Sequence, residues 1–504
     1  SEASFLGICG LIATMGYDGF LYSIGYLAGW IVALFVVAEP MKRLGKYTFT
    51  DALDSKFNSK AIQLMAAIST LAVSIFYLIP QMVGAGVLVT PLLGLPHWAG
   101  VIMVGIIVIT IVATAGMTST TYVQFLKGGL LIIFSTVITV MVLQKGLSTE
   151  SRPETFNPKI IAAADIDTSV RVTEAKTGLT FVKIVEDGVA NWWIVRGDNL
   201  EQAQSKVEMH SGETLYNGAP KTDNKFQSVG LVTKLPDGQT ETGSMGPLNY
   251  FSTIQGSEIV RYPKGNVAVF DHDGDHVKVF CPQVTAGADL MIPGQKFKIK
   301  SGIGKLNFIS LMLALFLGTA SLPHVLIRYY TVPSQRDARK STIVAIAGIG
   351  FFYVLTLFIG FGAMTLGVID VESGNMSAPL LAKAFGIFLF STISAIAFAT
   401  VLGTVSGLIV ATSGAIAHDL MDNYMGIQMN DKQKVMAGKT AAFGVGIIAI
   451  ILGIAFKGMN VAFLVGWAFA VAASANLPSI IMLLFWKKTT AKGIAFSIGV
   501  GMIS

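Results

Sequence analysis

Small polar residues gather deep inside one long apolar segment of the chain. Residues 387–420 include the run STISAIAFATVLGTVSGLIVATSGAIAHDL, which is dense in Ser, Thr, Gly and Ala. At the depth of a membrane helix bundle, hydroxyl oxygens and freed backbone carbonyls can coordinate a dehydrated Na+ ion. Small residues also allow helices to pack closely. The segment therefore supports two interpretations, an ion site and a helix-packing face.

A second polar feature interrupts another apolar run. In FYLIPQMVGAG, Tyr77, Pro80 and Gln81 place a helix breaker beside an amide side chain. A proline can break a helix where a cavity needs polar groups, or it can kink the helix against its neighbours. The sequence leaves both alternatives open.

Ionisable residues are rare within the apolar segments. They are Glu2, Asp18, Glu39, Lys127 and Arg328. A charged group inside a membrane segment is a functional hypothesis by default. Most of these residues lie near predicted segment ends, however, where long side chains can reach the interface instead.

Outside the apolar segments, the densest acidic motif is DHDGDH at residues 271–276. Its three carboxylates suggest Ca2+, but their order differs from that of an EF-hand loop, which also needs a distant Glu. A solvated β-turn between VAVF and HVKVF is the favoured interpretation. Cys9 and Cys281 lie in unlike settings, so we expect neither a disulfide between them nor a metal site.

Composition defines the elements that must position these residues. Of 504 residues, 53% are hydrophobic and 13% are charged, whereas an ordinary soluble domain carries about 25% charge. Apolar runs of about 20 residues can each cross a bilayer as a helix. No soluble-enzyme constellation and no G-x-x-x-x-G-K-[ST] nucleotide loop is present, so we expect a polytopic membrane protein that is neither an enzyme nor ATP-driven. The predicted spans are 17–40, 61–92, 97–115, 121–143, 306–330, 343–366, 387–420, 440–456, 461–486 and one that begins near residue 493.

Charge is placed unevenly along the chain. Residues 151–300 hold 16 basic and 18 acidic residues, whereas the remainder holds 20 and 12. Fifteen Lys and Arg residues fall in alternate loops between the spans, and only two fall in the opposite short loops. This bias places the basic loops in the cytoplasm and the central polar stretch outside. The net charge of +6 therefore reflects the orientation of the protein in the lipid bilayer. We expect no nucleic acid as a partner.

The polar stretch has the pattern of a separate β-rich unit. Between residues 145 and 304, short runs such as FVKIVED, NWWIVRGD and KFKIK alternate with period two and are separated by Pro, Gly, Asp and Asn. Such runs are typical of strands.

Five stretches carry a resemblance to a known family. They are SEASFLGICGLI, MKRLGKYTFTDALDSKF, AGMTSTTYVQFLKGGLL, LGTASLPHVLIRYYTVPSQRDARKS and SGLIVATSGAIAHDL. Together they resemble the sodium:solute symporter family, and within it the cation/acetate symporter branch. The resemblance covers essentially all of the membrane part.

The resemblance implies a mainly α, polytopic membrane fold of the leucine-transporter type. This fold is a five-plus-five inverted repeat, with substrate and ion bound at the midplane beside broken helices. Residues 1–144 would be the first half of the transporter core, truncated at the start of the first core helix. Residues 145–304 would be a small β-rich extramembrane insertion, and residues 305–504 the second half with the start of a further helix.

The same resemblance implies where the substrate binds. Family members contact it on the first core helix just after its break, which corresponds here to Ser1, Ser4 and Phe5. They also contact it on the third core helix, which carries Tyr77 and Gln81 in this chain. A carboxylate could additionally be held by backbone N–H groups of a half-helix, without a central Arg or Lys.

The Na+ site of the family corresponds to Thr400 through its carbonyl, and to Gly403 and Thr404. Many members carry a hydroxyl residue where this chain has Gly403, so Thr404 alone keeps a hydroxyl. The other half of the family's ion site precedes Ser1. We therefore expect no cofactor, and a coupling ion that is Na+ or H+.

These implications add up to a secondary active transporter of the bacterial inner membrane. It would couple Na+ or H+ to the uptake of acetate or a related short-chain monocarboxylate by alternating access, with residues 145–304 in the periplasm. The alternative is a transporter-like membrane sensor with an external ligand-binding domain, although no segment resembling a cytoplasmic histidine kinase is present.

Overall fold

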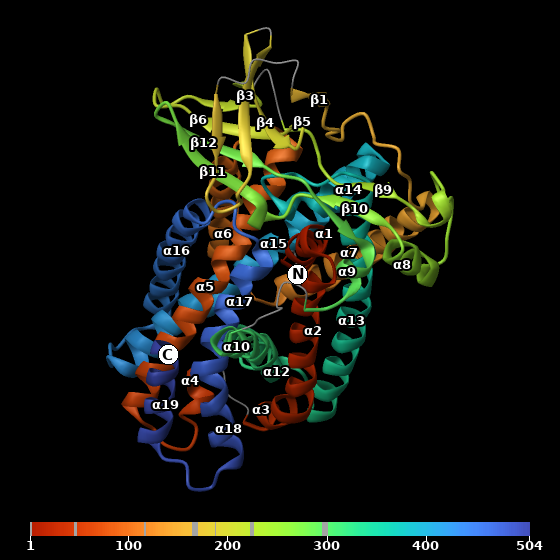
Figure 1. The fold of residues 1–504 in the computed structure, drawn as a ribbon. Helices are drawn as coiled ribbons and strands as arrows, with labels where there is room; N and C mark the ends of the chain where they lie inside the picture. The colour runs from red at the N-terminus through yellow and green to blue at the C-terminus, as the bar shows by residue number, and fades with distance from the viewer. Residues whose placement is uncertain are drawn as a thin grey trace.

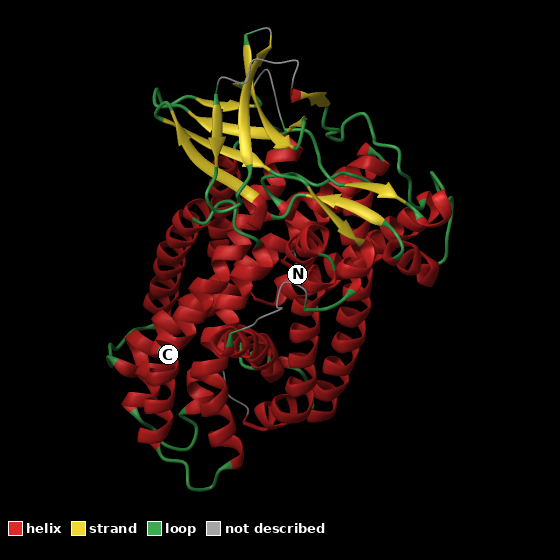
Figure 2. Ribbon diagram, viewed as in Figure 1, coloured by secondary structure: helices red, strands yellow, loops and turns green. Residues whose placement is uncertain are grey.

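The computed structural model describes residues 3–44, 48–114, 117–163, 170–186, 188–221, 226–294 and 301–504. Long helices form the body of the molecule, and the strands gather at one end of it (Figures 1 and 2). Ser1 and Glu2, which the sequence analysis singled out, lie outside the described residues.

Within the described residues, eight helices are long and apolar enough to cross a membrane. They are Tyr17–Leu44, Lys60–Thr90, Gln124–Lys145, Gly302–Leu326, Gln335–Thr365, Ile387–Tyr424, Asp431–Ala455 and Val461–Phe485. Three shorter apolar helices, Ala3–Met15, His97–Val112 and Ala491–Ile503, accompany them. Every predicted span overlaps one of these helical segments, so the prediction of a mainly α membrane protein is confirmed.

The first half of the body begins with a short helix that ends at a glycine. Gly16 has φ +71°, and a Cβ there would lie 2.6 Å from the Leu290 carbonyl oxygen, so the turn requires glycine. The elements are η1 (Ala3–Ile8), α1 (Cys9–Met15), α2 (Tyr17–Val32), η2 (Ala33–Val37), α3 (Ala38–Leu44), α4 (Phe49–Leu53), α5 (Lys60–Leu93), α6 (His97–Thr114) and α7 (Met117–Lys145). Helix α5 continues through Pro80, so this proline does not end the helix.

The second half contains the clear helix break. Helix α10 ends at Thr319, and α11 begins at Pro323, which suits the first turn because its missing N–H would have no helical partner there. The elements are α10 (Gly302–Thr319), α11 (Pro323–Leu326), α12 (Arg328–Thr331), α13 (Gln335–Thr365), η6 (Gly374–Met376), α14 (Ser377–Phe385), α15 (Ile387–Gly414), η7 (Ala415–Tyr424), α16 (Asp431–Ala455), α17 (Val461–Val471), η8 (Ala472–Asn476), α18 (Leu477–Phe485) and α19 (Ala491–Ile503).

The two halves interlock rather than stand apart. Helix α5 of the first half packs against α15, α16 and α17 of the second half, and α7 packs against α13 and α15. This interleaving buries a large shared hydrophobic cluster that extends from η1 to α17, and a second cluster that extends from Ala33 to Ile498. Both clusters therefore contain residues from the two halves.

Among the residues that the structure describes between α7 and α10, the strands form three antiparallel sheets. Their orders are β1-β5-β4-β3-β2, β11-β12-β6-β7-β8 and β13-β10-β9. The strands are β1 (Ile160–Ala162), β2 (Arg171–Thr173), β3 (Thr180–Glu186), β4 (Val189–Arg196), β5 (Asn199–Gln202), β6 (Gln204–Glu208), β7 (Thr214–Tyr216), β8 (Ala219–Pro220), β9 (Leu231–Lys234), β10 (Glu258–Arg261), β11 (Val267–His272), β12 (Asp275–Phe280) and β13 (Gln283–Ala286). The β-rich character predicted for the insertion is confirmed.

Short helices accompany the sheets and attach them to the helical body. They are η4 (Pro236–Gly238), α8 (Pro247–Gln255), η5 (Lys264–Asn266) and α9 (Gly287–Met291). Phe251 of α8 lies 4.7 Å from Phe358 of α13, measured between ring centroids. Val229 and Ile369 exchange backbone hydrogen bonds of 2.8 and 3.1 Å. These contacts hold the strand-rich end on the helices (Figure 1).

The acidic motif at residues 271–276 joins β11 to β12. Asp271 pairs with His276 and His272 with Asp275, while Asp273 and Gly274 adopt φ +52° and +83°. This is a two-residue hairpin turn, as the sequence predicted. Cys9 and Cys281 are both buried free thiols.

Candidate functional site

A cavity of 450 Å³ lies among the interlocked helices, beside the break between α10 and α11. Its wall is mostly apolar, and none of the described residues that line it is Asp, Glu, Lys or Arg. The lining residues with polar side-chain atoms are Ser4, Tyr26, Trp30, Tyr77, Gln124, Thr319, His324 and Tyr353. A small concave site with a few polar groups is the usual form of a small-molecule binding site.

His324 is the most distinctive of these residues. Its ring stacks on that of Tyr77, with centroids 5.2 Å apart and planes at 25°. Its Nδ1 atom is buried and has no hydrogen-bond partner among the described residues. A buried polar atom left unpaired costs about 1–3 kcal/mol, so the buried Nδ1 atom sets His324 apart from the other lining residues.

The predicted substrate residues take different positions. Ser4 and Tyr77 line the cavity. Phe5 and Gln81 are fully buried and are not part of its lining, and neither amide atom of Gln81 has a hydrogen-bond partner among the described residues. Ser1 lies outside the described residues. The substrate roles of these five residues stay predictions.

The predicted ion-site residues lie on α15, where their hydroxyls bond to their own helix. Thr404 Oγ1 donates to the Thr400 carbonyl oxygen at 3.0 Å, and Thr400 Oγ1 donates to the Ile396 carbonyl oxygen at 2.8 Å. The Gly403 carbonyl oxygen accepts a 3.0 Å hydrogen bond from Gln124 Nε2. Both hydroxyls and the carbonyls of 400 and 403 are therefore already in use within the protein.

A lysine from α7 reaches the same face of α15. The side chain of Lys127 is buried, with 5% of the residue exposed, and its Nζ donates to the Ala399 carbonyl oxygen at 2.7 Å. A Cβ built on Gly403 would lie 1.8 Å from this Nζ. The ammonium group thus fills the space that any side chain at position 403 would need.

Comparison with known proteins identifies the family. The profile of the sodium:solute symporter family matches residues 1–190 and 268–501. The chain belongs to the sodium:solute symporter family. It is a cation-coupled solute symporter embedded in a membrane and not an enzyme, as predicted.

Two relatives match the symporter over its whole length. One is the "Uncharacterized symporter YwcA" of Bacillus subtilis (strain 168), which is 35% identical over 512 residues and is covered to 75%. The other is the "Monocarboxylic acid transporter" of Corynebacterium glutamicum, which is 36% identical over 515 residues and is covered to 73%.

A solved structure has a similar fold. It is a substrate-bound, outward-open Na+-coupled sialic acid symporter, with a TM-score of 0.55 and 12% identity, covering 100% of this chain and 84% of that one. The predicted leucine-transporter-like architecture is therefore confirmed.

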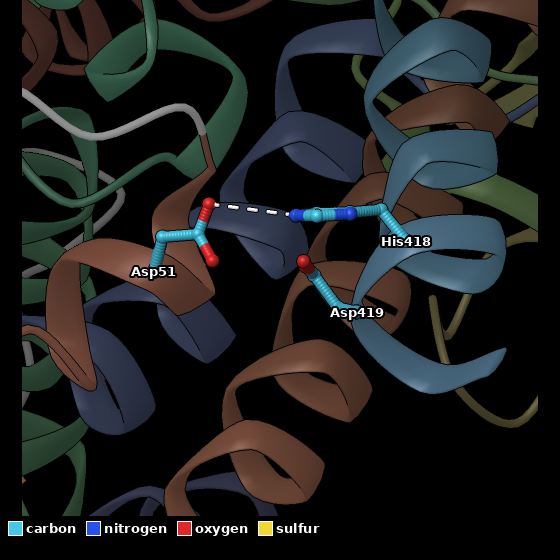
Figure 3. Close-up of side chains that lie close together, drawn as sticks. All are labelled: Asp51, His418 and Asp419. Atoms are coloured by element: carbon cyan, nitrogen blue, oxygen red, sulfur yellow. Dashed lines mark ion pairs between the residues drawn. The ribbon is translucent and has the colours of Figure 1, made fainter. Parts of the chain in front are cut away.

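A second polar cluster lies at the end of the same helix that carries Gly403. Asp51 of α4 faces His418 and Asp419 of η7 (Figure 3), and one ligand-type atom from each lies within 4.8 Å of the others. His418 Nε2 pairs with Asp51 Oδ2 at 3.7 Å, and Thr48 Oγ1 donates to Asp419 Oδ1 at 3.1 Å. The cluster ties the α4 segment to η7.

The charge of Asp51 is stabilised by this arrangement. Burial raises the pKa of Asp51, but hydrogen bonds from His418 and Thr48 and the charge of His418 outweigh it and hold the pKa below its usual value. Asp51 is therefore ionised at neutral pH and keeps α4 attached to η7.

A larger cavity of 630 Å³ lies between the helices and the strand-rich end. Arg261 of β10 lines it, donating from Nη1 to the Thr14 carbonyl oxygen at 3.2 Å and from Nε to Thr285 Oγ1 at 2.9 Å. Burial lowers the pKa of Arg261, whereas Asp18 and Asp289 act to raise it. The strands therefore contribute a charged residue to the cavity next to α1.

Sequence reasoning missed three residues around these sites. Lys127 was noted as an intramembrane charge but given no role, and His324 stood in the quoted motif LPHVLIRYYTVP without one. Gln124 carried no signal of its own. Their importance depends on which helices face each other, which the sequence pattern does not reveal.

Proposed function

We propose that this symporter carries acetate or a related short-chain monocarboxylate into the cell, coupled to Na+ or H+. The observation that carries the proposal is the small cavity whose described lining includes His324 and has no charged Asp, Glu, Lys or Arg side chain. The relative named a monocarboxylic acid transporter, which is 36% identical, supports the same substrate class.

The chemistry of the cavity suits a small anion with an apolar tail. As an N–H tautomer, Nδ1 of His324 would donate to a carboxylate oxygen after a rotation of the ring toward the cavity, and Ser4, Tyr77 and Tyr353, which carry hydroxyls, also line the cavity. Acidic side chains, which would repel a carboxylate, are absent from the described lining. The apolar remainder, including Phe352 and Phe469, leaves room for a short alkyl group.

Transport would follow the alternating-access scheme of inverted-repeat transporters. One repeat moves relative to the other around a substrate held at the helix breaks. The coupling ion contributes through its different affinities for the two conformations. The distribution of Lys and Arg orients the basic loops toward the cytoplasm. For a bacterial inner membrane, the strand-rich insertion then faces the periplasm.

Acetate uptake tests this proposal. The full-length protein is reconstituted in proteoliposomes, and entry of radiolabelled acetate is followed with an imposed Na+ gradient, with an imposed H+ gradient and with neither. Protein-free liposomes correct for acetic acid that crosses the bilayer unaided. We expect protein-dependent accumulation under at least one gradient. If neither gradient drives accumulation of acetate, propionate or pyruvate above the protein-free control, the proposal is wrong.

A further inference from the structure

We propose that the ammonium group of Lys127 is the resident cation of the α15 site, in the place of a Na+ ion, and that substrate uptake by this symporter therefore does not require Na+. The inference deepens the proposed function and rests on it. It removes one of the two coupling ions that the sequence left open and leaves H+.

The first argument is steric. The Lys127 Nζ lies 1.8 Å from the position of a Cβ on Gly403, and its Cε lies 3.0 Å from it. Real Cβ contacts are never that short, so Lys127 can adopt this position only because residue 403 is glycine. Glycine at position 403 lacks the hydroxyl that many family members have. The same lack of a side chain on α15 leaves the space that the ammonium of Lys127 from α7 occupies.

The second argument concerns the oxygen atoms of the predicted Na+ ligands and the carbonyl oxygen next to them. The Ala399 carbonyl oxygen, one residue before Thr400, accepts a hydrogen bond from Nζ at 2.7 Å. The Gly403 carbonyl oxygen accepts one from Gln124, and the Thr400 carbonyl oxygen accepts the Thr404 hydroxyl. An ammonium group and Na+ carry the same charge and both bind carbonyl oxygens, so the lysine supplies by hydrogen bonds what the ion would supply by coordination.

The third argument is electrostatic. Arg328 of α12 reaches the same face of α15 one turn further along, where its Nη2 would lie 3.5 Å from a Cβ on Gly407. Helices α7, α14 and α15 contain no Asp or Glu. A Na+ ion added here would share this face of α15 with two cationic side chains. The site therefore does not fit Na+ while Lys127 is in place.

The direct test is Na+ binding to matched variants. Binding of ²²Na+ is measured for the wild type, Lys127→Ala, Gly403→Ser and the double variant Lys127→Ala/Gly403→Ser. The double variant removes the ammonium and restores the hydroxyl that many family members have. Lys145→Ala, at the exposed end of α7, and Gly414→Ser, which has open space around it in α15, are the matched controls.

We expect no saturable Na+ binding by the wild type and both controls, and saturable binding by the double variant. Saturable Na+ binding by the wild type would overturn the inference. A double variant that is monodisperse but binds no more Na+ than the wild type would also overturn it, since the α15 face would then be a packing face only.

A transport measurement separates this inference from the proposed function. Exchange of labelled for unlabelled acetate is measured in choline buffer without Na+ and in Na+ buffer. Equal rates support the inference, and exchange that requires Na+ contradicts it while leaving the proposed function intact. Absence of protein-dependent exchange in both buffers contradicts the proposed function instead.

Discussion

Helix α15 and its continuation η7 contact two polar clusters. One contains a cationic side chain from another helix, and the other contains two carboxylates and a histidine. Near the middle of the run, Gly403 faces an ammonium from Lys127 and no carboxylate from α7 or α15. At the end of the run, Asp419 and His418 face the carboxylate of Asp51 (Figure 3). The residues expected to bind a cation are thus already provided with one, whereas three residues with metal-ligand atoms serve to join two segments.

The difference shows that ligand-type residues do not define an ion site by themselves. An ion site also requires that its oxygen atoms are not already hydrogen-bonded to other groups of the protein. At Gly403 the carbonyl oxygen is occupied by Gln124, and at Asp419 a carboxylate oxygen is occupied by Thr48. Lys127→Ala and Asp51→Asn test the two sides of this comparison, and His324→Phe and Lys206→Ala test the cavity and the strand-rich end; the four follow in order of decreasing expected effect.

Lys127→Ala is expected to have the largest effect. It removes a buried charged hydrogen bond to the Ala399 carbonyl, and such bonds contribute about 1.5–3 kcal/mol. We expect the rate of acetate exchange without Na+ to fall on the order of tenfold to a hundredfold. Initial rates in proteoliposomes measure this, with Lys145→Ala as the control that keeps the wild-type rate. If Lys127→Ala exchanged acetate at the wild-type rate, Lys127 would have no role in transport.

His324→Phe keeps an aromatic ring beside Tyr77 but removes Nδ1. If Nδ1 binds the carboxylate, the acetate concentration at half-maximal uptake should rise about tenfold, which corresponds to one lost hydrogen bond. Concentration-dependent uptake measures it, and His210→Phe on the exposed part of the strand-rich end is the control. An unchanged half-saturation concentration would place substrate recognition elsewhere in the cavity.

Asp51→Asn tests the second cluster. It breaks the pair with His418 and should destabilise the protein by about 1–3 kcal/mol at pH 7, since a partly buried hydrogen-bonded charge is lost. We expect uptake to keep its half-saturation concentration, because the cluster does not line the cavity.

The effect of Asp51→Asn should depend on pH. Since the pKa of Asp51 is lowered in the folded protein, its stabilisation is complete above the unfolded value of about 4 and is lost as the pH falls through the folded pKa. Thermal unfolding of wild type and variant at pH 7, 5 and 3 measures this, with Asp237→Asn as the control. A stability difference that persists unchanged at pH 3 would exclude the carboxylate as its source.

Lys206→Ala should have the smallest effect. Lys206 of β6 pairs with Glu372, which follows α13, at 3.8 Å and with Glu208 at 3.3 Å, and all three side chains are partly exposed. Such pairs contribute about 0–1 kcal/mol, so unfolding should shift slightly and acetate uptake should not change. A marked loss of uptake would show that the strand-rich end influences transport through this contact.

The sequence predicted the membrane helices and the β-rich insertion well, because both depend on local pattern. Length and hydropathy locate the spans, and period-two alternation locates strands such as those around Trp192 and Trp193. Prolines differ in this respect, since α5 passes through Pro80, whereas the break at residues 320–322 is followed directly by Pro323. A proline in a membrane bundle can be accommodated when neighbouring groups satisfy the freed carbonyl.

The candidate site was only partly predictable. Ser4 and Tyr77 do line the cavity, and Gly403 was recognised as a missing hydroxyl. The meaning of Gly403 depends on Lys127, which is far away in sequence and meets it only when α7 packs against α15. No single-sequence pattern reports such a pair. The same holds for His324, whose role depends on the cavity around it.

Acetate exchange with and without Na+ tests the central claim most directly. Proteoliposomes loaded with unlabelled acetate are placed in labelled acetate at equal pH on both sides, in choline or in Na+ buffer. We expect a protein-dependent rate in choline that matches the rate in Na+ buffer. A rate that falls tenfold or more when Na+ is removed would contradict the account, because the ammonium of Lys127 would then not replace the ion.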